Sequence, residues 1–320
     1  MAFASFFLVF WHYFLRSERG LAILPLESVA GTAIFYFISG FVITMSFERQ
    51  SVKKFLIKRF FRLYPVIVFI LCVSLFVVIF INGRHEIRNL DINLKNILVN
   101  LTFIPHLFPS NILAPYDYLY ISTTWTICCD FTFYFLLILA YKFKTPKQRI
   151  NFIVILSLIL LVIVNILREK FNIYGTMFYT LCCLLPFYFG MASYYYSKNY
   201  MTKRHFLIIA ILIFTPIIFQ TLYVRYVIGG LLMWYLFTYH KELGNNKIVR
   251  FFAHISYPMF LIHAIVPILI WPFSDVCLKG INKFMFFILY PAMIPICYFI
   301  YRFIEKPCNE FGRRITSNMK

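Results

Sequence analysis

The sequence predicts an all-α integral membrane protein in which about ten transmembrane helices form one bundle. Of its 320 residues, 62% are hydrophobic and 13% are charged, whereas an ordinary soluble domain has roughly 45–50% and 25%. Apolar runs separated by charged segments recur along the whole chain, and a membrane-spanning helix needs about 20 mostly apolar residues. These observations exclude a soluble globular protein, and they predict a single membrane domain over residues 1–320.

Each predicted span is an apolar run bounded by charged or turn-forming residues. The first run has about 14 residues, which reach about 21 Å of a hydrocarbon core near 30 Å. We therefore expect the first helix to be truncated and the natural start to lie upstream of Met1. The ten spans are expected at about 2–15, 29–46, 63–82, 123–141, 150–167, 174–195, 205–221, 223–239, 254–272 and 284–302.

Two segments outside these spans have a predicted role in the topology. Residues 83–122 are the longest break between spans and contain three prolines among aromatic residues, which predicts the longest extracytoplasmic loop. Residues 303–320 follow the last span and predict a cytoplasmic tail, because Pro307 is expected to stop the helix.

Positive charge predicts the orientation of the chain in the cell membrane. The chain has 31 Lys and Arg and 12 Asp and Glu, and the basic residues divide 21 to 10 between alternate connecting segments. Because basic loops are retained in the cytoplasm, both termini are expected there. The net charge of +19 also favours contact with anionic membrane lipids. No solvated basic domain is present to bind a duplex, so nucleic acid is not an expected partner.

The eight cysteines predict packing residues and no metal site. They lie mostly inside apolar runs, and no Cys or His cluster has the spacing of metal ligands. Adjacent cysteines, as in Cys128-Cys129 and Cys182-Cys183, point to different sides of a helix. Shared coordination by either pair is therefore not expected.

Ionisable side chains inside predicted spans are costly, and they mark candidate sites. His12 could accept a proton at physiological pH, although an interfacial histidine would give the same pattern. Asp130 shares a helix face with Thr126 and Tyr134. This stripe fits either a carboxylate bonded to a neighbouring helix or a charge that orients a base or a substrate hydroxyl. His263 fits a packed histidine with one hydrogen bond at least as well as a site residue.

Three further features add candidate residues, two near span ends and one in the middle of a span. Arg59 and Arg62 are three residues apart, so they share a helix face, and two guanidinium groups there can bind a phosphate or simply anchor the helix. Ser39 precedes a glycine in a predicted span, which allows close helix approach or room for a ligand. Glu305 at the end of the last span fits a salt bridge or an active role equally well.

Five segments, taken in order, resemble the acyltransferase-3 family of ten-span membrane acyltransferases. The matching segments begin at residues 31, 58, 125, 255 and 303 and read GTAIFYFISGFVI, KRFFRLYP, WTICCDFTFY, ISYPMFLIHA and FIEKP. The family's patterns are Arg-x-x-Arg before Tyr-Pro, Trp-Ser-Leu-x-x-Glu-x-x-Phe-Tyr, Ser-Tyr-x-x-Tyr-Leu-x-His and a closing Glu-x-Pro. Here Asp130 stands where the family has Glu, and Thr126 stands where it has Ser.

The resemblance implies an O-acyltransferase that moves an acyl group, most often acetyl, from cytoplasmic acyl-CoA to a hydroxyl of a lipid-linked or exported glycan, such as a surface polysaccharide or lipopolysaccharide. It implies that His12 is the general base, with Asp130 in a catalytic role. Arg59 and Arg62 match the arginine pair associated with the acyl-CoA co-substrate, and no bound cofactor or metal is implied. Supporting roles in substrate binding or structure fall to Ser39, Trp125, Thr126, Tyr134, His263 and Glu305.

A polytopic transporter or flippase for a glycan or lipid intermediate is the alternative. Ten spans with polar residues near the membrane midplane fit that function equally well on physical grounds. No inverted repeat is visible in the sequence to support it. Acyl-CoA dependence separates the two functions, because a flippase neither binds acyl-CoA nor adds an acyl group to the glycan.

Overall fold

The computed structural model is helical throughout the elements it describes, and no strand occurs in them. The helices are α2 (Ser28–Glu48), α3 (Val52–Asn82), α6 (Thr124–Ala140), α7 (Pro146–Phe171), α8 (Thr176–Ser197), α9 (Lys203–Ile218), α11 (Lys247–Ile262), α14 (Phe284–Ile300), the π-helical turn η6 (Tyr301–Glu305) and α15 (Lys306–Ser317). The described residues are 5, 6, 9, 28–82, 94, 97, 98, 101, 124–171, 176–218, 231, 234, 235, 246–263, 265 and 284–319.

The all-helical class predicted from composition is confirmed, and the helix bounds agree closely with several predicted spans. Within the described residues, three helices are long and apolar enough to cross a membrane, at Val52–Phe76, Pro146–Leu167 and Phe287–Ser317, and shorter apolar helices occur at Ala33–Glu48 and Thr126–Ala140. The predicted spans 2–15 and 223–239 and the predicted loop 83–122 lie almost wholly outside the described residues. The count of ten spans therefore stays a prediction.

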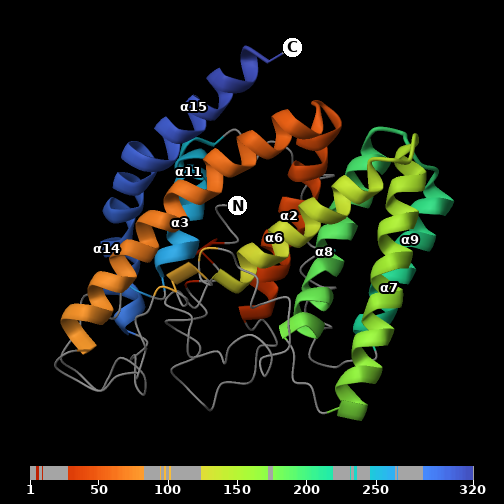
Figure 1. Ribbon diagram of the computed structural model, residues 1–320, viewed down its shortest axis with the longest axis horizontal. Helices are drawn as coiled ribbons and strands as arrows, with labels where there is room; N and C mark the ends of the chain where they lie inside the picture. Colours follow the sequence, from red (N-terminus) through yellow and green to blue (C-terminus); the bar gives the residue numbers. More distant parts are fainter. Residues whose placement is uncertain are drawn as a thin grey trace.

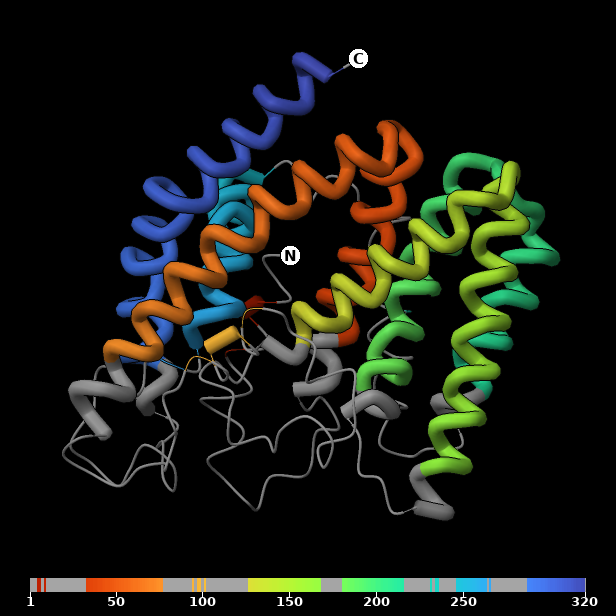
Figure 2. The backbone as a smooth tube through the Cα atoms, viewed as in Figure 1, coloured from red at the N-terminus to blue at the C-terminus, as the bar shows by residue number. Residues whose placement is uncertain are grey.

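From α2 to α9, successive helices run in alternating directions, so that alternate connections lie at the same end (Figure 2). The turns from α2 to α3, α6 to α7 and α8 to α9 lie at one end together with α15 (Figure 1). These are segments in which the basic residues assigned to the cytoplasm concentrate. The structure thus gathers these basic segments at one end, as the alternation predicted, while the side of the membrane on which that end lies stays a prediction.

Helix α7 lies at the edge of the structure (Figure 1). From Ile155 onward it exposes apolar side chains. Six of them, from 40% to 57% exposed, are Ile155, Ile159, Val162, Ile163, Ile166 and Leu167. In water such a face would be strongly unfavourable, whereas lipid chains cover it without cost. This surface is that of a membrane protein.

Helices α2 and α8 cross so closely that each needs a glycine at the contact. A Cβ atom built on Gly40 would lie 2.1 Å from the Phe187 carbonyl oxygen, and one on Gly190 would lie 2.1 Å from the Phe37 carbonyl oxygen. Small residues let membrane helices approach until their backbones touch. The sequence predicted either close helix approach or room for a ligand at Ser39-Gly40. The structure shows close helix packing there, and Ser39 itself is buried.

The last helix does not end where Pro307 was expected to stop it. The backbone widens through η6, where the N–H of Lys306 donates to the Tyr301 carbonyl, and α15 then continues to Ser317 with Pro307 in its first turn. Proline is tolerated there because the first N–H groups of a helix have no partner within the helix. The segment 303–320, predicted as a tail, is thus helical over most of its length, and Gly312 packs against Phe61 of α3.

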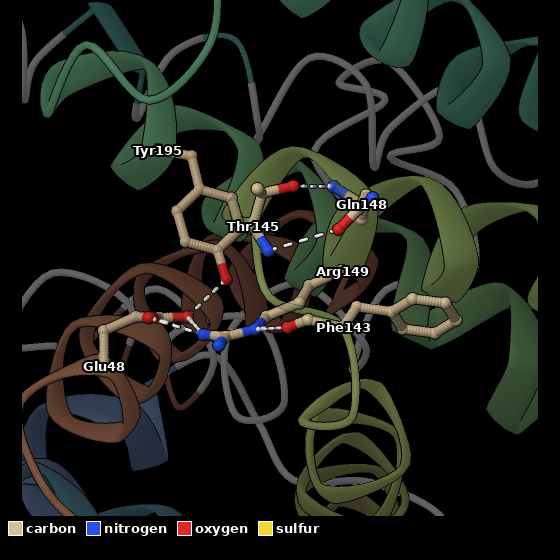
Figure 3. Close-up of polar contacts among 6 residues, drawn as sticks. All are labelled: Glu48, Phe143, Thr145, Gln148, Arg149 and Tyr195. Carbon is tan, nitrogen blue, oxygen red and sulfur yellow. Dashed lines mark hydrogen bonds and ion pairs between the residues drawn. The ribbon is translucent and has the colours of Figure 1, made fainter.

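A partly buried polar clasp ties three helices together near the turn between α6 and α7 (Figure 3). Arg149 of α7 donates from Nη1 to both carboxylate oxygens of Glu48 at 2.7 Å, and the Tyr195 hydroxyl of α8 donates to Glu48 Oε1 at 2.7 Å. Thr145 and Gln148 form reciprocal 3.3 Å hydrogen bonds across the first turn of α7. This capping box begins the helix at a defined residue and so orients Arg149 toward Glu48.

Adding one methyl group at the α2–α8 crossing is expected to destabilise the protein. We expect Gly40→Ala and Gly190→Ala each to cost about 1–3 kcal/mol, because the added carbon must push two backbones apart. Thermal unfolding in detergent measures the effect. Val162→Ile adds one carbon at a side chain that is 57% exposed and should leave the midpoint unchanged; equal midpoints for all three variants would contradict the close crossing.

We expect substitutions of Glu48 and Arg149, the charged residues of the clasp, to have coupled effects on the free energy of unfolding. In a double-mutant cycle with Glu48→Gln and Arg149→Met, we expect a coupling of about 1–2 kcal/mol in the free energy of unfolding, since the two residues share two hydrogen bonds. Thr316→Ala on α15, combined with Arg149→Met, serves as the distant control and should be additive. A coupling near zero between Glu48 and Arg149 would show that the clasp contributes nothing to stability.

Candidate active site

Arg59 is a charged side chain buried in the interior of the bundle. It lies in the second turn of α3 and is only 8% exposed. Its guanidinium carbon lies 5.3 Å from the centroid of the Phe55 ring and 5.9 Å from that of Tyr134 on α6. Both distances are within the range of a cation–π interaction, so aromatic faces hold the charge in place. The predicted span 63–82 begins too late because α3 starts at Val52 and carries this arginine inside the helix.

Helix α6 places Asp130 and Tyr134 on the face that meets Arg59. Both residues are buried, and they are one turn apart, as the sequence predicted from their spacing. The Asp130 carboxylate is within electrostatic range of Arg59 and of Arg62. None of the described residues donates a hydrogen bond to Asp130 Oδ1. The structure therefore brings both arginines together with the acidic stripe of α6, which the sequence alone left as separate candidates.

Two residues from the C-terminal part of the chain complete this cluster. Glu305 at the end of η6 is 5% exposed and lies within electrostatic range of Arg62. Tyr257 of α11 is also buried, and its hydroxyl donates a 3.2 Å hydrogen bond to the Leu63 carbonyl of α3. Tyr257 was not among the candidate residues, although its match to the first Tyr of the pattern Ser-Tyr-x-x-Tyr-Leu-x-His was an available signal.

The other predicted site residues occupy different positions. Thr126 is buried one turn before Asp130. His263 is buried at the end of α11, with its Nδ1 at 2.7 Å from the Phe260 carbonyl oxygen, so it caps its own helix. Trp125 belongs to α6, but its side chain lies outside the described residues, as does the whole of His12. The structure therefore does not test the prediction that His12 is the base.

The cluster has the chemistry of an anion-binding site. In the described part of the chain, the ion pair closer than 4 Å is the one between Glu48 and Arg149, so neither Arg59 nor Arg62 is neutralised by direct contact with a carboxylate. Guanidinium groups in a buried setting bind phosphate strongly. No group of three or more metal-ligating side chains occurs among the described residues.

Comparison with known proteins identifies the family of this chain. The family model described as an acyltransferase domain, Acyl_transf_3, matches residues 2–302. The chain belongs to the acyltransferase-3 family. No curated protein and no solved structure gives a significant match to the chain. The family model and the apolar helices together identify a membrane acyltransferase.

Most of the buried cluster lies within the range matched by the acyltransferase-3 family model. The matched range includes α3, α6 and α11, the helices that supply Arg59, Arg62, Asp130, Tyr134 and Tyr257. Glu305 lies just beyond its last residue. The acyltransferase thus has two arginines, two carboxylates and two tyrosines in one interior region, which the resemblance in sequence order predicted only in part.

The buried charges of Arg59 and Asp130 are expected to depend on each other. Arg59→Met and Asp130→Asn alone should each cost about 1–3 kcal/mol of unfolding free energy, because each removes the attraction between two buried charges that lie near each other without direct contact. The double variant should lose clearly less than the two single losses combined. Chemical unfolding in detergent measures this cycle, with Arg59→Met and Ser157→Ala as a distant pair expected to be additive. Additivity for Arg59 and Asp130 would show that their charges do not interact.

Proposed function

We propose that this membrane acyltransferase transfers an acyl group, most often acetyl, from cytoplasmic acyl-CoA to a hydroxyl group of a lipid-linked or cell-surface carbohydrate. The observation that carries the proposal is the buried Arg59 guanidinium beside Arg62, at the basic end of the bundle and without a directly paired carboxylate in the described residues. Acyl-CoA carries phosphate groups, and paired guanidinium groups bind phosphate oxygens through charge-assisted hydrogen bonds.

The position of the arginines suits a donor that enters from the cytoplasm. The first turns of α3 carry Lys53, Lys54 and Lys58 before Arg59, so positive charge increases toward the predicted entry. A CoA molecule bound there by its phosphates would direct its long pantetheine arm into the bundle. The thioester would then reach the interior, where Asp130 and Tyr134 lie on α6.

The proposed chemistry is a direct acyl transfer. The acceptor hydroxyl oxygen attacks the thioester carbonyl carbon, a C–O bond forms, and the C–S bond breaks to release CoA. His12 takes the hydroxyl proton as general base and returns it to the leaving sulfur, so no other reactant is needed. Asp130 orients the base or the acceptor hydroxyl through its carboxylate. Fixed dipoles around the thioester would stabilise the oxyanion that develops.

Two arguments support the proposal of a carbohydrate acceptor: the resemblance of the motifs and their order to the family, and the membrane location of the enzyme. A lipid-linked or exported glycan meets the enzyme at the bilayer, where the predicted outer end of the first span places His12. The flippase alternative gains no specific support from the structure, and membership of an acyltransferase family counts against it.

The donor site can be tested by replacing its arginines. We expect Arg59→Gln and Arg62→Gln each to raise the KM for acetyl-CoA about tenfold or more, since each removes charge-assisted hydrogen bonds to phosphate. His12→Ala should abolish turnover while CoA binding persists. Purified enzyme in nanodiscs, acetyl-CoA and cell-surface glycan, followed by mass spectrometry of ester-linked acetyl groups, provide the assay.

Arg204→Gln is the matched control, because Arg204 is an exposed arginine at the same end of the structure, on α9. It should leave the KM for acetyl-CoA unchanged. Enzyme that neither binds CoA nor adds acetyl groups to glycan would overturn the proposal and favour transport. A KM that responds equally to Arg204 and Arg59 would show that only general positive charge matters.

A further inference from the structure

Tyr257 forms a polar link between α11 and α3 at the level of the arginine pair. Its side chain is 7% exposed, and its hydroxyl donates to the Leu63 carbonyl at 3.2 Å. The two residues are far apart in the sequence, so this hydrogen bond joins separate parts of the fold. Leu63 directly follows Arg62 in α3. The hydroxyl therefore holds the backbone next to one of the two arginines.

Charged and polar members of the cluster surround Tyr257. Its phenol lies within electrostatic range of Glu305, Asp130, Tyr134 and Arg62. These residues come from η6, α6 and α3, so three elements besides its own place such groups near this ring. A side chain in this position can affect the arginine site without itself touching the donor.

The helices on both sides of this link are weakened by proline at the same level. Pro65 lies inside α3, two residues after Leu63, and Pro258 lies inside α11, directly after Tyr257. A proline inside a helix removes one hydrogen bond of the ladder and bends the helix. The backbone hydrogen bonds of α3 and α11 therefore restrain the rotation of each helix less firmly near these prolines. A hydrogen bond between the two helices supplies part of the missing restraint.

We propose that Tyr257 is a positioning residue for the donor site. Its hydroxyl holds the turn of α3 that carries Arg62 against α11, and thereby sets the direction in which the arginine pair faces the phosphates of acyl-CoA. This inference rests on the proposed function of Arg59 and Arg62. It assigns Tyr257 to donor binding and gives it no part in the bond-making step.

Tyr188→Phe is a close control for the loss of the Tyr257 hydroxyl. Tyr188 of α8 is completely buried, and its hydroxyl forms a 2.7 Å hydrogen bond with the Ser157 hydroxyl of α7. It too joins two helices, but neither of them carries the arginine pair. Tyr188→Phe and Tyr257→Phe thus make the same chemical change at two buried interhelical hydrogen bonds, and only one of these bonds adjoins Arg62.

The experiment measures CoA binding, turnover and unfolding for wild type, Tyr257→Phe, Tyr188→Phe and Arg62→Gln. Tyr257→Phe removes one oxygen and leaves the ring in its packing, so the variant is expected to fold. We expect its Kd for CoA to rise about five- to tenfold, the effect of losing one buried hydrogen bond, with kcat at saturating acetyl-CoA within about twofold of wild type. Tyr188→Phe should lower the unfolding midpoint similarly and leave the Kd unchanged.

The other possible results distinguish a failure of the positioning role of Tyr257 from a failure of the proposed donor site. If Arg62→Gln weakens CoA binding and Tyr257→Phe does not, the positioning role is wrong and the donor site stands. If Tyr257→Phe lowers kcat at an unchanged Kd, Tyr257 acts in the chemical step and the inference is also wrong. An equal rise in Kd for Tyr188→Phe would show a general loss of stability. If Arg62→Gln binds CoA normally, the donor site and the inference both fail.

Discussion

The burial of the Arg59 guanidinium between aromatic rings is the constraint on which the arrangement of the interior depends. An isolated ion in an apolar interior is very costly, so it must be surrounded by groups that compensate for lost water. Phe55 and Tyr134 supply ring faces at 5.3 and 5.9 Å, and Asp130 supplies an opposite charge nearby. Because these groups come from α3 and α6, the two helices must meet where Arg59 lies.

This meeting point joins two parts of the bundle. Helices α3, α11, α14 and α15 lie on one side in Figure 2, and α2, α6, α7, α8 and α9 lie on the other. The second group is held by the glycine crossing of α2 and α8 and by the clasp of Glu48, Arg149 and Tyr195. The first group contributes Arg59, Arg62 and Tyr257 to the site, together with Glu305 of η6, and the second contributes Asp130 and Tyr134.

The acyltransferase also shows how a membrane protein divides its surface from its interior. Apolar side chains of α7 face outward and are exposed, whereas Arg59 of α3, Asp130 of α6 and Glu305 of η6 are buried. This is the reverse of a soluble domain, because lipid solvates apolar groups and cannot donate hydrogen bonds. Charges buried in a membrane protein mark candidate functional sites, and here Arg59, Asp130 and Glu305 lie in one region of the interior.

The sequence by itself determined the helical membrane class, most helix positions, the grouping of basic segments and the membership of an acyltransferase family. These properties follow from composition, from local periodicity and from short motifs, all of which can be read along one dimension. The pairing of Asp130 with Tyr134 was also predictable, since both lie on one helix. The position of Asp130 and Tyr134 near Arg59, the hydrogen bond of Tyr257 to Leu63 and the ion pair of Glu48 with Arg149 were decided only by the tertiary structure. They depend on which helices become neighbours, and side-chain packing between distant segments leaves no local signal in the sequence.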